Sequence, residues 1–340
     1  MNRRESWIDC IKVLACALIL VGHLLQGLLR TGILVRDSRL DFFIWLIYLF
    51  HVQLFFLSSG YLYERGQRAE NFKEWIRNIG YKFISLGVPY FVFSIITWLL
   101  KNEFVDLVNI RTGHLFDFLF LSPTSAQYWY LYTLFFLFVF IPNVKNIKIL
   151  MGILIVLFVL YMFSAMLAPF FVIYSIAQYG FWFVLGMIMQ RMGFENLAPK
   201  KRILFTSLVF LILFVGISSA LYSYGYRATF SAWTILLGTL ACLGFSILFK
   251  YLEAGGVVIK SVTVLSMYTF PIYLLHTIYA ASIRTFLIFI GIRNIPVHVV
   301  LGIVFGFYGS ILTAFLFHKL VYPEFVFYPW KVIKKIKNKT

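Results

Sequence analysis

The chain has 340 residues, of which 61% are hydrophobic, 20% aromatic and only 13% charged, and its mean hydropathy is +0.88. This composition excludes a soluble globular protein and predicts an all-α polytopic membrane helix bundle, organised as a single domain over residues 1–340. The formal net charge of +17 does not indicate nucleic acid as a partner. The basic residues fall between apolar segments, where we expect them to contact anionic membrane lipids.

Ten apolar runs are long enough to span a bilayer as helices. They fall at about 8–29, 41–63, 80–100, 127–143, 148–168, 172–190, 203–223, 229–249, 264–290 and 297–320. Of the 30 lysines and arginines, 20 lie in connections that are cytoplasmic if the N terminus is inside, and 7 lie in the opposite connections. Both termini are therefore expected in the cytoplasm.

Two connections carry further expectations. The stretch at about 101–126 is the longest external one, and it forms either a lid over an outer cavity or a plain linker. The lysine-rich tail at about 331–340 is expected to anchor on the inner leaflet.

The first segment, at 7–29, is apolar yet carries Asp9, Lys12 and His23. On a helix, Lys12 and His23 return to nearly the same face about 16 Å apart along the axis. Each ionisable group inside a bilayer costs on the order of 2 to 3 kcal/mol, which predicts a polar lane facing the protein interior. Alternatively, Asp9 and Lys12 form an ordinary pair near the headgroups. The two charges also interrupt the signal-peptide pattern, so we expect this segment to be retained.

The second segment, at 41–63, holds His51 near its middle. A single histidine in an apolar helix is more often a hydrogen-bonded core residue than a catalyst. Here the preceding segment supplies His23, and two segments joined by a short loop are natural antiparallel neighbours. We therefore expect His23 and His51 to face one cavity in the outer half of the membrane.

Arg65 and Arg68 follow this segment and share a face if the helix continues. A guanidinium pair is a good receptor for phosphate groups. Basic residues just inside a span are also what the topology rule alone predicts. Together with Lys12, the pair would place three cations at the cytoplasmic mouth of the polar lane.

The ordered motifs resemble integral-membrane acyltransferase family 3, and within it the branch of fucose 4-O-acetylases and polysaccharide O-acetyltransferases. The matching residues are Ile8-Asp9, Lys12-x10-His23, Phe50-His51-Val52-Gln53-Leu54-Phe55-Phe56-Leu57-Ser58-Ser59-Gly60-Tyr61, Arg65-x-x-Arg68, Gln127-Tyr128-Trp129-Tyr130-Leu131 and Pro271-Ile272-Tyr273-Leu274-Leu275-His276. The chain departs from the family where the usual methionine-proline pair is Val52-Gln53, which removes a proline kink, and where Lys12 replaces the usual arginine.

The resemblance implies transfer of an acyl group, most often acetyl, from cytoplasmic acetyl-CoA (acyl-CoA) to a sugar hydroxyl of a cell-surface or lipid-linked glycan. It also implies the inner membrane of a bacterium. Lys12, Arg65 and Arg68 would bind the coenzyme A phosphates. His23 would be the general base, because a histidine pKa near 6.5 lets it take a proton and return it to the leaving thiolate.

The remaining candidates have supporting roles, and their assignments stay open. His51 and His276 would orient His23 or handle a second proton, although core packing explains His276 equally well. Oxyanion donors for the tetrahedral intermediate would come from Ser59, Trp129 or Tyr130. Arg284 would bind an anionic group of acceptor or donor, or turn outward to the headgroups.

A metal site is not expected, since no carboxylate pair or histidine-carboxylate spacing of metal type occurs within the segments. Cys10, Cys16 and Cys242 give neither a disulfide framework nor a ligand cluster. Two other function classes fit the same segments: a sugar or lipid-linked glycan transporter or flippase with a proton relay, and a non-catalytic subunit of a glycan export complex. The expected partners are acyl-CoA, the glycan or glycolipid acceptor and membrane lipids. The sequence does not decide whether the chain forms a homo-oligomer.

Overall fold

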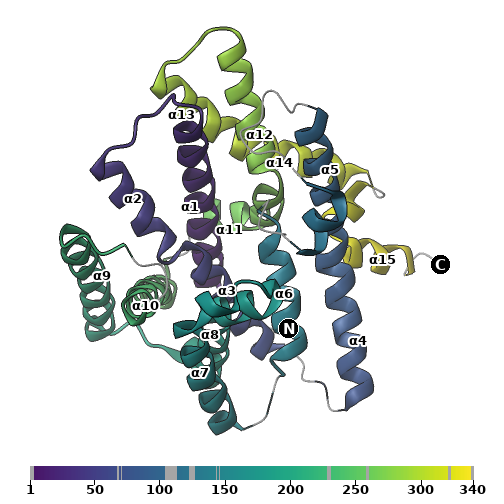
Figure 1. Cartoon of the computed structure of the whole chain (residues 1–340). Helices are drawn as coiled ribbons and strands as arrows, with labels where there is room; N and C mark the ends of the chain where they lie inside the picture. Colours follow the sequence, from purple (N-terminus) through teal and green to yellow (C-terminus); the bar gives the residue numbers. More distant parts are fainter. Residues whose placement is uncertain are drawn as a thin grey trace. The chain divides into compact units, whose positions relative to one another are not determined.

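The computed structural model describes residues 4–66, 69, 71–103, 113–121, 127–142, 144, 146–227, 231–257, 260–320 and 323–337. The structure is 84% helical, and these ranges contain no strand (Figure 1). Eight helices in the described part of the chain are long and apolar enough to cross a membrane: Ser6–Arg30, Ser38–Arg65, Phe72–Glu103, Phe171–Arg191, Lys201–Ser223, Ala232–Ala254, Thr269–Phe289 and Ile295–Lys319. The predicted all-α polytopic membrane bundle is confirmed.

Two of the ten expected segments form shorter apolar helices. The fourth is α6 (Trp129–Phe140), with 12 residues, and the fifth is α7 (Ile147–Met162), with 16 residues. A straight helix needs about 20 residues to cross the hydrocarbon core. The number of ten spans and the cytoplasmic position of both termini therefore stay predictions.

The chain forms two compact units, each assembled from three stretches. Unit 1 comprises Met1–Ile19, Asp37–Arg68 and Ile141–Met267, and unit 2 comprises Leu20–Arg36, Ala69–Phe140 and Tyr268–Thr340. Helix α1 (Ser6–Arg30) contributes its first part to unit 1 and its second part to unit 2. Each unit is described by itself below.

Unit 1 is built around helices α3 (His51–Arg65) and α8 (Phe171–Arg191), which pack closely. At Gly60 a Cβ would lie 1.8 Å from the carbonyl oxygen of Phe183, so only glycine lets the two backbones meet. The motif glycine of the Ser58-Ser59-Gly60 stretch is thus explained by helix packing. The other helices of this unit are α2 (Ser38–Tyr48), α7, α9 (Lys201–Ser223), α10 (Ala232–Ala254) and α11 (Lys260–Ser266), with short 3₁₀ turns at Ser164–Leu167 and Phe194–Asn196.

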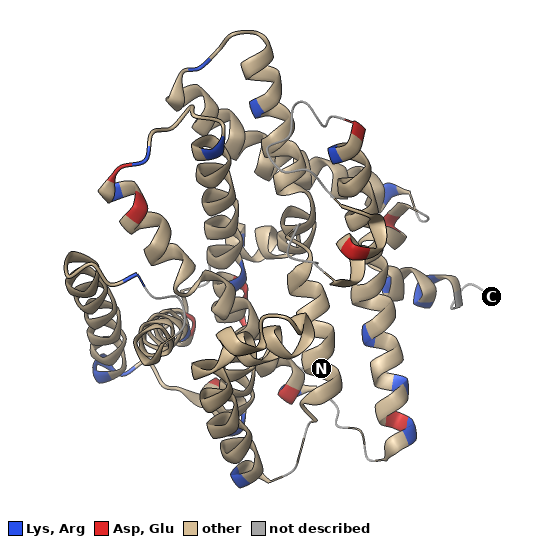
Figure 2. Cartoon of the chain, viewed as in Figure 1, with Lys and Arg blue, Asp and Glu red and all other residues tan. Residues whose placement is uncertain are grey.

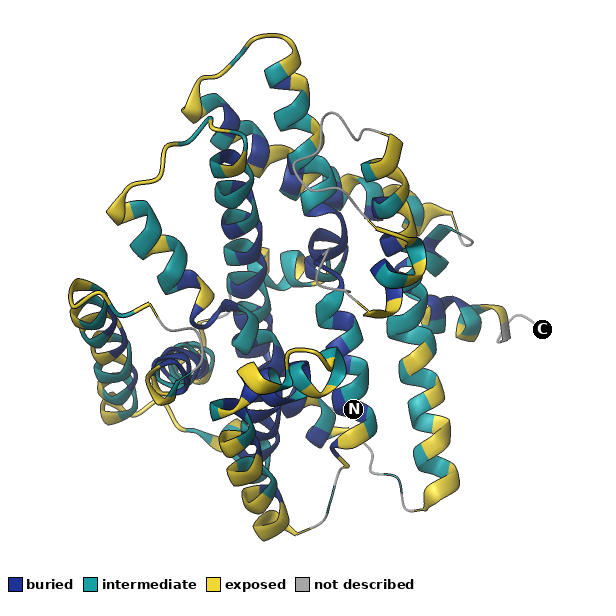
Figure 3. Cartoon of the chain, viewed as in Figure 1, coloured by how far each residue is buried: buried dark blue, intermediate teal, exposed yellow. Residues whose placement is uncertain are grey.

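The helices of unit 1 differ in burial and charge. Figure 3 shows α8 largely buried and α9 mostly exposed or half-buried. The basic residues that open α9 stand at one end of an otherwise uncharged helix (Figure 2). Since no water is present in the hydrocarbon core, an exposed helix that is uncharged beyond its first two residues is what a lipid-facing position requires.

The second span, Ser38–Arg65, has His51 near its middle as expected, but the helix is interrupted just before that residue. Helix α2 ends at Tyr48 and α3 begins at His51, with Phe50 as N-cap at φ −144° and ψ −19°. His51 Nδ1 lies 2.8 Å from the carbonyl oxygen of Ile47, and Cys242 Sγ lies 3.9 Å from that of Phe50. The His51 ring thus contacts a carbonyl at the end of α2, and the break occurs without proline.

In unit 2, the second part of α1 packs on α12 (Thr269–Phe289) and α13 (Ile295–Val304) through a cluster of Leu24, Leu28 and Ala280. Helix α13 continues through a π-helical turn, Phe305–Gly309, into α14 (Ser310–Lys319). The helix α4 (Phe72–Lys82) continues in the same way through Phe83–Gly87 into α5 (Val88–Glu103). Asp117–Leu121 forms a further π-helical turn, and α6 completes the apolar helices of this unit.

The basic tail begins as helix α15 (Pro329–Lys337), preceded by a 3₁₀ turn at Pro323–Val326. The buried Glu324 carboxylate accepts hydrogen bonds at 2.8 Å from Lys331, Lys335 and His318. Trp330 packs against Tyr81 of α4 with ring centroids 4.3 Å apart. The tail is thus fixed to unit 2 at its root, while its role as a lipid anchor stays a prediction.

Candidate active site

A histidine pair lies in unit 2, at the contact between α1 and α12. The rings of His23 and His276 have centroids 5.4 Å apart. The Nδ1 atom of His276 lies 2.9 Å from the carbonyl oxygens of both Ile272 and Tyr273. Carbonyl oxygens only accept hydrogen bonds, so Nδ1 carries the proton and the Nε2 of a neutral ring holds a lone pair.

That lone pair has no partner. The Nε2 atom of His276 is buried and makes no hydrogen bond with the described residues. Buried polar atoms are nearly always hydrogen-bonded in proteins, and an exception calls for an explanation such as a reactive role or a ligand. An oriented ring with an available lone pair is the geometry that a general base or its hydrogen-bonding partner requires.

The two later sequence motifs interlock behind this histidine. Tyr273 donates a hydrogen bond of 2.5 Å to the carbonyl oxygen of Gln127, and Tyr128 donates one of 3.0 Å to that of Leu274. The amide of Gln127 reaches the same Leu274 oxygen at 3.3 Å, and Tyr128 also contacts Thr97 at 3.0 Å. These bonds fix the first turns of α12, and with them the backbone that orients His276.

Of the three expected oxyanion donors, two belong to this region. Trp129 opens α6, and Tyr130 packs edge-on against Tyr273 with centroids 5.6 Å apart. The third, Ser59, is half-buried in α3 of unit 1. The expected cation Arg284 lies in α12, and its guanidinium rests against Gly27 of α1.

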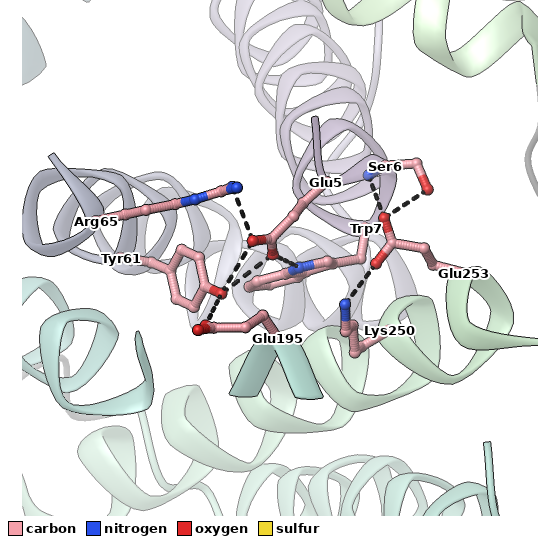
Figure 4. A network of polar contacts seen from close by, with 8 residues as sticks. All are labelled: Glu5, Ser6, Trp7, Tyr61, Arg65, Glu195, Lys250 and Glu253. Carbon is pink, nitrogen blue, oxygen red and sulfur yellow. Dashed lines mark hydrogen bonds and ion pairs between the residues drawn. The ribbon is translucent and has the colours of Figure 1, made fainter. Parts of the chain in front are cut away.

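The candidate donor cations belong to unit 1, where Arg65 takes part in a polar network around Glu5 (Figure 4). Arg65 Nη1 lies 2.7 Å from Glu5 Oε1, and the Arg65 side chain is 22% exposed. The Trp7 indole N–H also donates to Glu5. Tyr61 Oη lies 3.1 Å from Glu5 Oε2 and 3.0 Å from Glu195 Oε2. A phosphate that binds Arg65 therefore meets a guanidinium that already holds a carboxylate.

The same network fixes the start of α1. The backbone N–H and hydroxyl of Ser6 donate to Glu253 Oε1 at 2.5 and 3.0 Å, and Lys250 donates to Glu253 Oε2 at 2.8 Å (Figure 4). A carboxylate at a helix N-terminus satisfies an otherwise unpaired N–H and interacts favourably with the helix dipole. Glu253 and Lys250 therefore help to hold the start of α1 in place.

Neighbouring ions are also paired. Asp9 Oδ2 accepts a hydrogen bond from Arg4 Nε at 2.7 Å. The headgroup alternative predicted an ion pair between Asp9 and Lys12, whereas the described ion pair of Asp9 is with Arg4. Arg191 Nε lies 2.5 Å from Glu64 Oε1 in a pair whose side chains are 8% and 0% exposed. Lys12 makes no hydrogen bond or ion pair with a described residue, and it is half-buried.

Several expectations remain outside these arrangements. His51 lies in unit 1 and His23 in unit 2, so a cavity shared by the two histidines stays a prediction. Arg68 lies outside the described residues, and so does most of the proposed lid, at 104–112 and 122–126. The described part of the chain contains no group of three His, Cys, Asp or Glu side chains that could hold a metal ion, and the three cysteines are free.

Sequence reasoning missed the residues that hold these side chains in place. Glu5 and Glu195 flank Tyr61, while Gln127 and Tyr128 support α12. Gln127 and Tyr128 belong to one of the motifs that resemble the family, which indicated that they matter. The motif did not indicate their partner, because Leu274 lies 146 residues after Tyr128. Glu5 had no signal beyond its position before the first span.

Comparison with known proteins identifies the class. Residues 5–315 match a family model described as an acyltransferase domain. The nodulation protein NolL of Mesorhizobium japonicum is 28% identical over 134 residues, a match that covers 39% of this chain and 34% of that protein. No solved structure matches the chain. Because the family match covers most of a chain that is itself a bundle of apolar helices long enough to span a membrane, this integral membrane protein belongs to acyltransferase family 3.

Proposed function

We propose that this chain is a bacterial inner-membrane O-acyltransferase that moves an acyl group, acetyl in the first instance, from cytoplasmic acyl-CoA to a sugar hydroxyl of a cell-surface or lipid-linked glycan. The family supports acyl transfer. The single observation that carries the chemistry is the His23–His276 pair, with the unpartnered Nε2 of His276.

The two histidines have different roles in proton transfer. Two imidazole rings joined by an N–H···N bond have centroids about 5 Å apart, if the bond is about 2.9 Å long. The observed separation of 5.4 Å is close to that geometry. That bond is not formed in this structure, where His276 Nε2 has no hydrogen-bond partner among the described residues. We expect the two rings to close to this distance when substrate binds, so that Nε2 accepts the N–H of His23 and the other nitrogen of His23 keeps a lone pair for the substrate. His23 is the general base and His276 positions it.

The reaction proceeds as a direct transfer between the two substrates. His23 takes the proton of the sugar hydroxyl while its oxygen attacks the thioester carbonyl. The C–S bond breaks, and the departing coenzyme A thiolate receives that proton from His23. The products are the sugar ester and coenzyme A, and no group remains on the protein.

Donor binding is assigned to Lys12, Arg65 and Arg68. Within this set, Lys12 is the cation without a described partner, whereas Arg65 is held by Glu5. We expect Lys12 to contribute mainly charge attraction to a phosphate, and Arg65 to contribute through the network that it shares with Glu5.

The test is release of free thiol from acetyl-CoA by the purified full-length protein in nanodiscs, where water replaces the acceptor. His23→Ala should lower thiol release by about 10²- to 10⁴-fold while acetyl-CoA binding persists. His276→Ala should lower kcat with little change in KM, and His276→Gln should recover part of it, because its amide oxygen also accepts a hydrogen bond. His114→Ala, at an exposed position, is the matched control.

Two results would oppose the proposal. Folded protein that neither binds acetyl-CoA nor releases thiol points to sugar transport. Thiol release that survives in His23→Ala removes that residue as the base.

A further inference from the structure

Arg284 is an arginine inside a candidate membrane span, and its guanidinium is turned toward the neighbouring helix. A Cβ added at Gly27 would lie 2.1 Å from Arg284 Nη1 and 3.2 Å from Cζ. The guanidinium thus occupies the space that a side chain at position 27 would fill, and a larger residue there would displace it. The side chain is packed between the helices of unit 2 and is not simply extended toward the headgroups.

This guanidinium lacks a counter-ion in the described part of the chain. Its Nε atom is buried and has no hydrogen-bond partner, and no described residue forms an ion pair with Arg284. Arg30, exposed at the end of α1, lies three residues after Gly27 and so about one helical turn further along the same helix. An arginine inside a span is costly unless an anion neutralises its charge.

The Arg284 guanidinium lies close to the histidine pair along the helix axes. Gly27 lies one turn beyond His23 on α1, about 6 Å further along the axis. On α12, Arg284 lies about 12 Å beyond His276, but helical side chains tilt toward the N-terminus of their helix. The guanidinium thus reaches back toward His276, and its contact with Gly27 places it about one helical turn from the two rings.

We propose that Arg284, supported by Arg30, binds an anionic oxygen group, a carboxylate or phosphate, of the acceptor glycan. This assignment rests on the acyl transfer proposed above. The separation of one turn corresponds to about the width of one sugar ring, so the charge is carried by the accepting sugar or by the residue joined to it. The acceptor class is an acidic glycan, and Arg284 holds it with a hydroxyl at His23.

The experiment is isothermal titration calorimetry of the full-length protein in maltoside micelles with glucuronate and with inorganic phosphate, and with glucose as the neutral comparison. At least one of the anions should bind more tightly than glucose. Arg284→Gln should weaken anion binding about 10- to 100-fold, since a charge-assisted bidentate contact is lost. Arg284→Lys should recover part, because it keeps the charge without the planar fork. Lys319→Gln, which removes a cation that packs on Phe315, is the matched control.

A second variant leaves the charge in place. Gly27→Ala introduces a Cβ where the guanidinium lies, so it should weaken anion binding although Arg284 is intact. The proposal is overturned if neither anion binds the wild-type protein, or if binding is unchanged in both Arg284→Gln and Gly27→Ala.

A lipid headgroup offers the same anionic chemistry, and nanodiscs separate the two sources. Adding phosphatidylglycerol to phosphatidylcholine nanodiscs should leave glucuronate binding in place. Competitive displacement by phosphatidylglycerol would make the ligand a lipid and overturn the acceptor assignment. Acetyl-CoA hydrolysis, measured on the same wild-type samples, keeps the two proposals apart. Anion binding through Arg284 in folded protein that neither binds nor hydrolyses acetyl-CoA refutes acyl transfer and leaves Arg284 as an anion site whose ligand is not an acyl acceptor. Hydrolysis without anion binding refutes the acceptor site alone.

Discussion

Two groups of ionisable side chains, one in each unit, differ in whether they have partners. In unit 1, Arg65 holds Glu5, Lys250 holds Glu253 and Arg191 holds Glu64. In unit 2, the Nε2 atom of His276 and the Nε atom of Arg284 are buried without a hydrogen bond to any described residue. Both sets lie on apolar helices, where a polar group is costly unless it is satisfied.

We infer that the paired charges stabilise the fold and that the unpaired groups bind substrate. A charge that is neutralised inside the protein stabilises the fold and has little capacity left for a ligand. A buried group without a partner lowers stability in the empty protein and gains its partner when substrate binds. Substitutions in the two groups should therefore have opposite profiles, with large effects on stability for the paired residues of unit 1 and large effects on ligand binding or rate for His276 and Arg284 of unit 2.

The largest loss of stability is expected for Glu64→Gln. It leaves the Arg191 guanidinium, in a side chain 8% exposed, without its carboxylate. Breaking a buried pair from one side costs about 3 to 5 kcal/mol, which should appear in the free energy of unfolding measured by SDS titration in mixed micelles. The double variant Glu64→Leu/Arg191→Met should recover part of the loss. Arg284→Met should change stability by less than about 1 kcal/mol, and an equal loss there would erase the difference between the units.

A smaller loss is expected where the pair is partly exposed. Arg65→Met removes the cation bound to Glu5 and should lower the free energy of unfolding by about 1.5 to 3 kcal/mol. Glu5→Gln in the same chain should restore part of it. Lys12→Met should leave stability nearly unchanged and weaken acetyl-CoA binding, measured by calorimetry. A destabilised Lys12→Met with normal binding would show that Lys12 is a structural residue.

Tyr273→Phe tests how far the support of α12 serves the histidine pair. The hydroxyl that bonds Gln127 is lost, at a cost of about 1 kcal/mol. Because the carbonyl of residue 273 helps to orient His276, kcat for thiol release should fall with little change in KM. Tyr308→Phe, at a position 67% exposed, should behave as wild type. A stability change with unaltered kcat would confine Tyr273 to packing.

The smallest effect at neutral pH is expected at Glu324, outside the spans. Burial raises the pKa of this carboxyl, but hydrogen bonds from Lys331, Lys335 and His318 outweigh it and lower the pKa to about 2. A lowered pKa in the folded state contributes stability above the usual value of 4.5, and that contribution is lost as the pH falls toward 2. The protection factors for hydrogen exchange at 329–337, which correct for the intrinsic rate at each pH, should therefore fall over this range. Glu324→Gln should exchange faster at pH 7 and lose this pH dependence.

Sequence patterns determined the helical membrane class, the positions of the apolar runs and the family. These features depend on local composition and on ordered motifs such as Lys12-x10-His23. Both can be read from the sequence because they do not depend on how the helices pack. They also selected His23 and His276 as candidates. They paired His23 with His51 on the basis of chain order, because loop length is the only neighbour information that a sequence offers.

Tertiary structure decided which groups meet. His276 lies 253 positions after His23, and their contact depends on the packing of α1 against α12, which periodicity does not encode. The break before His51 contains no proline, so no residue type in the sequence indicates its position. Likewise, only the fold shows that Arg65 is neutralised by Glu5 while Arg284 is not neutralised by any described residue. Charge can be read from the chain, but whether a charge has a partner depends on distances between residues that are remote in sequence.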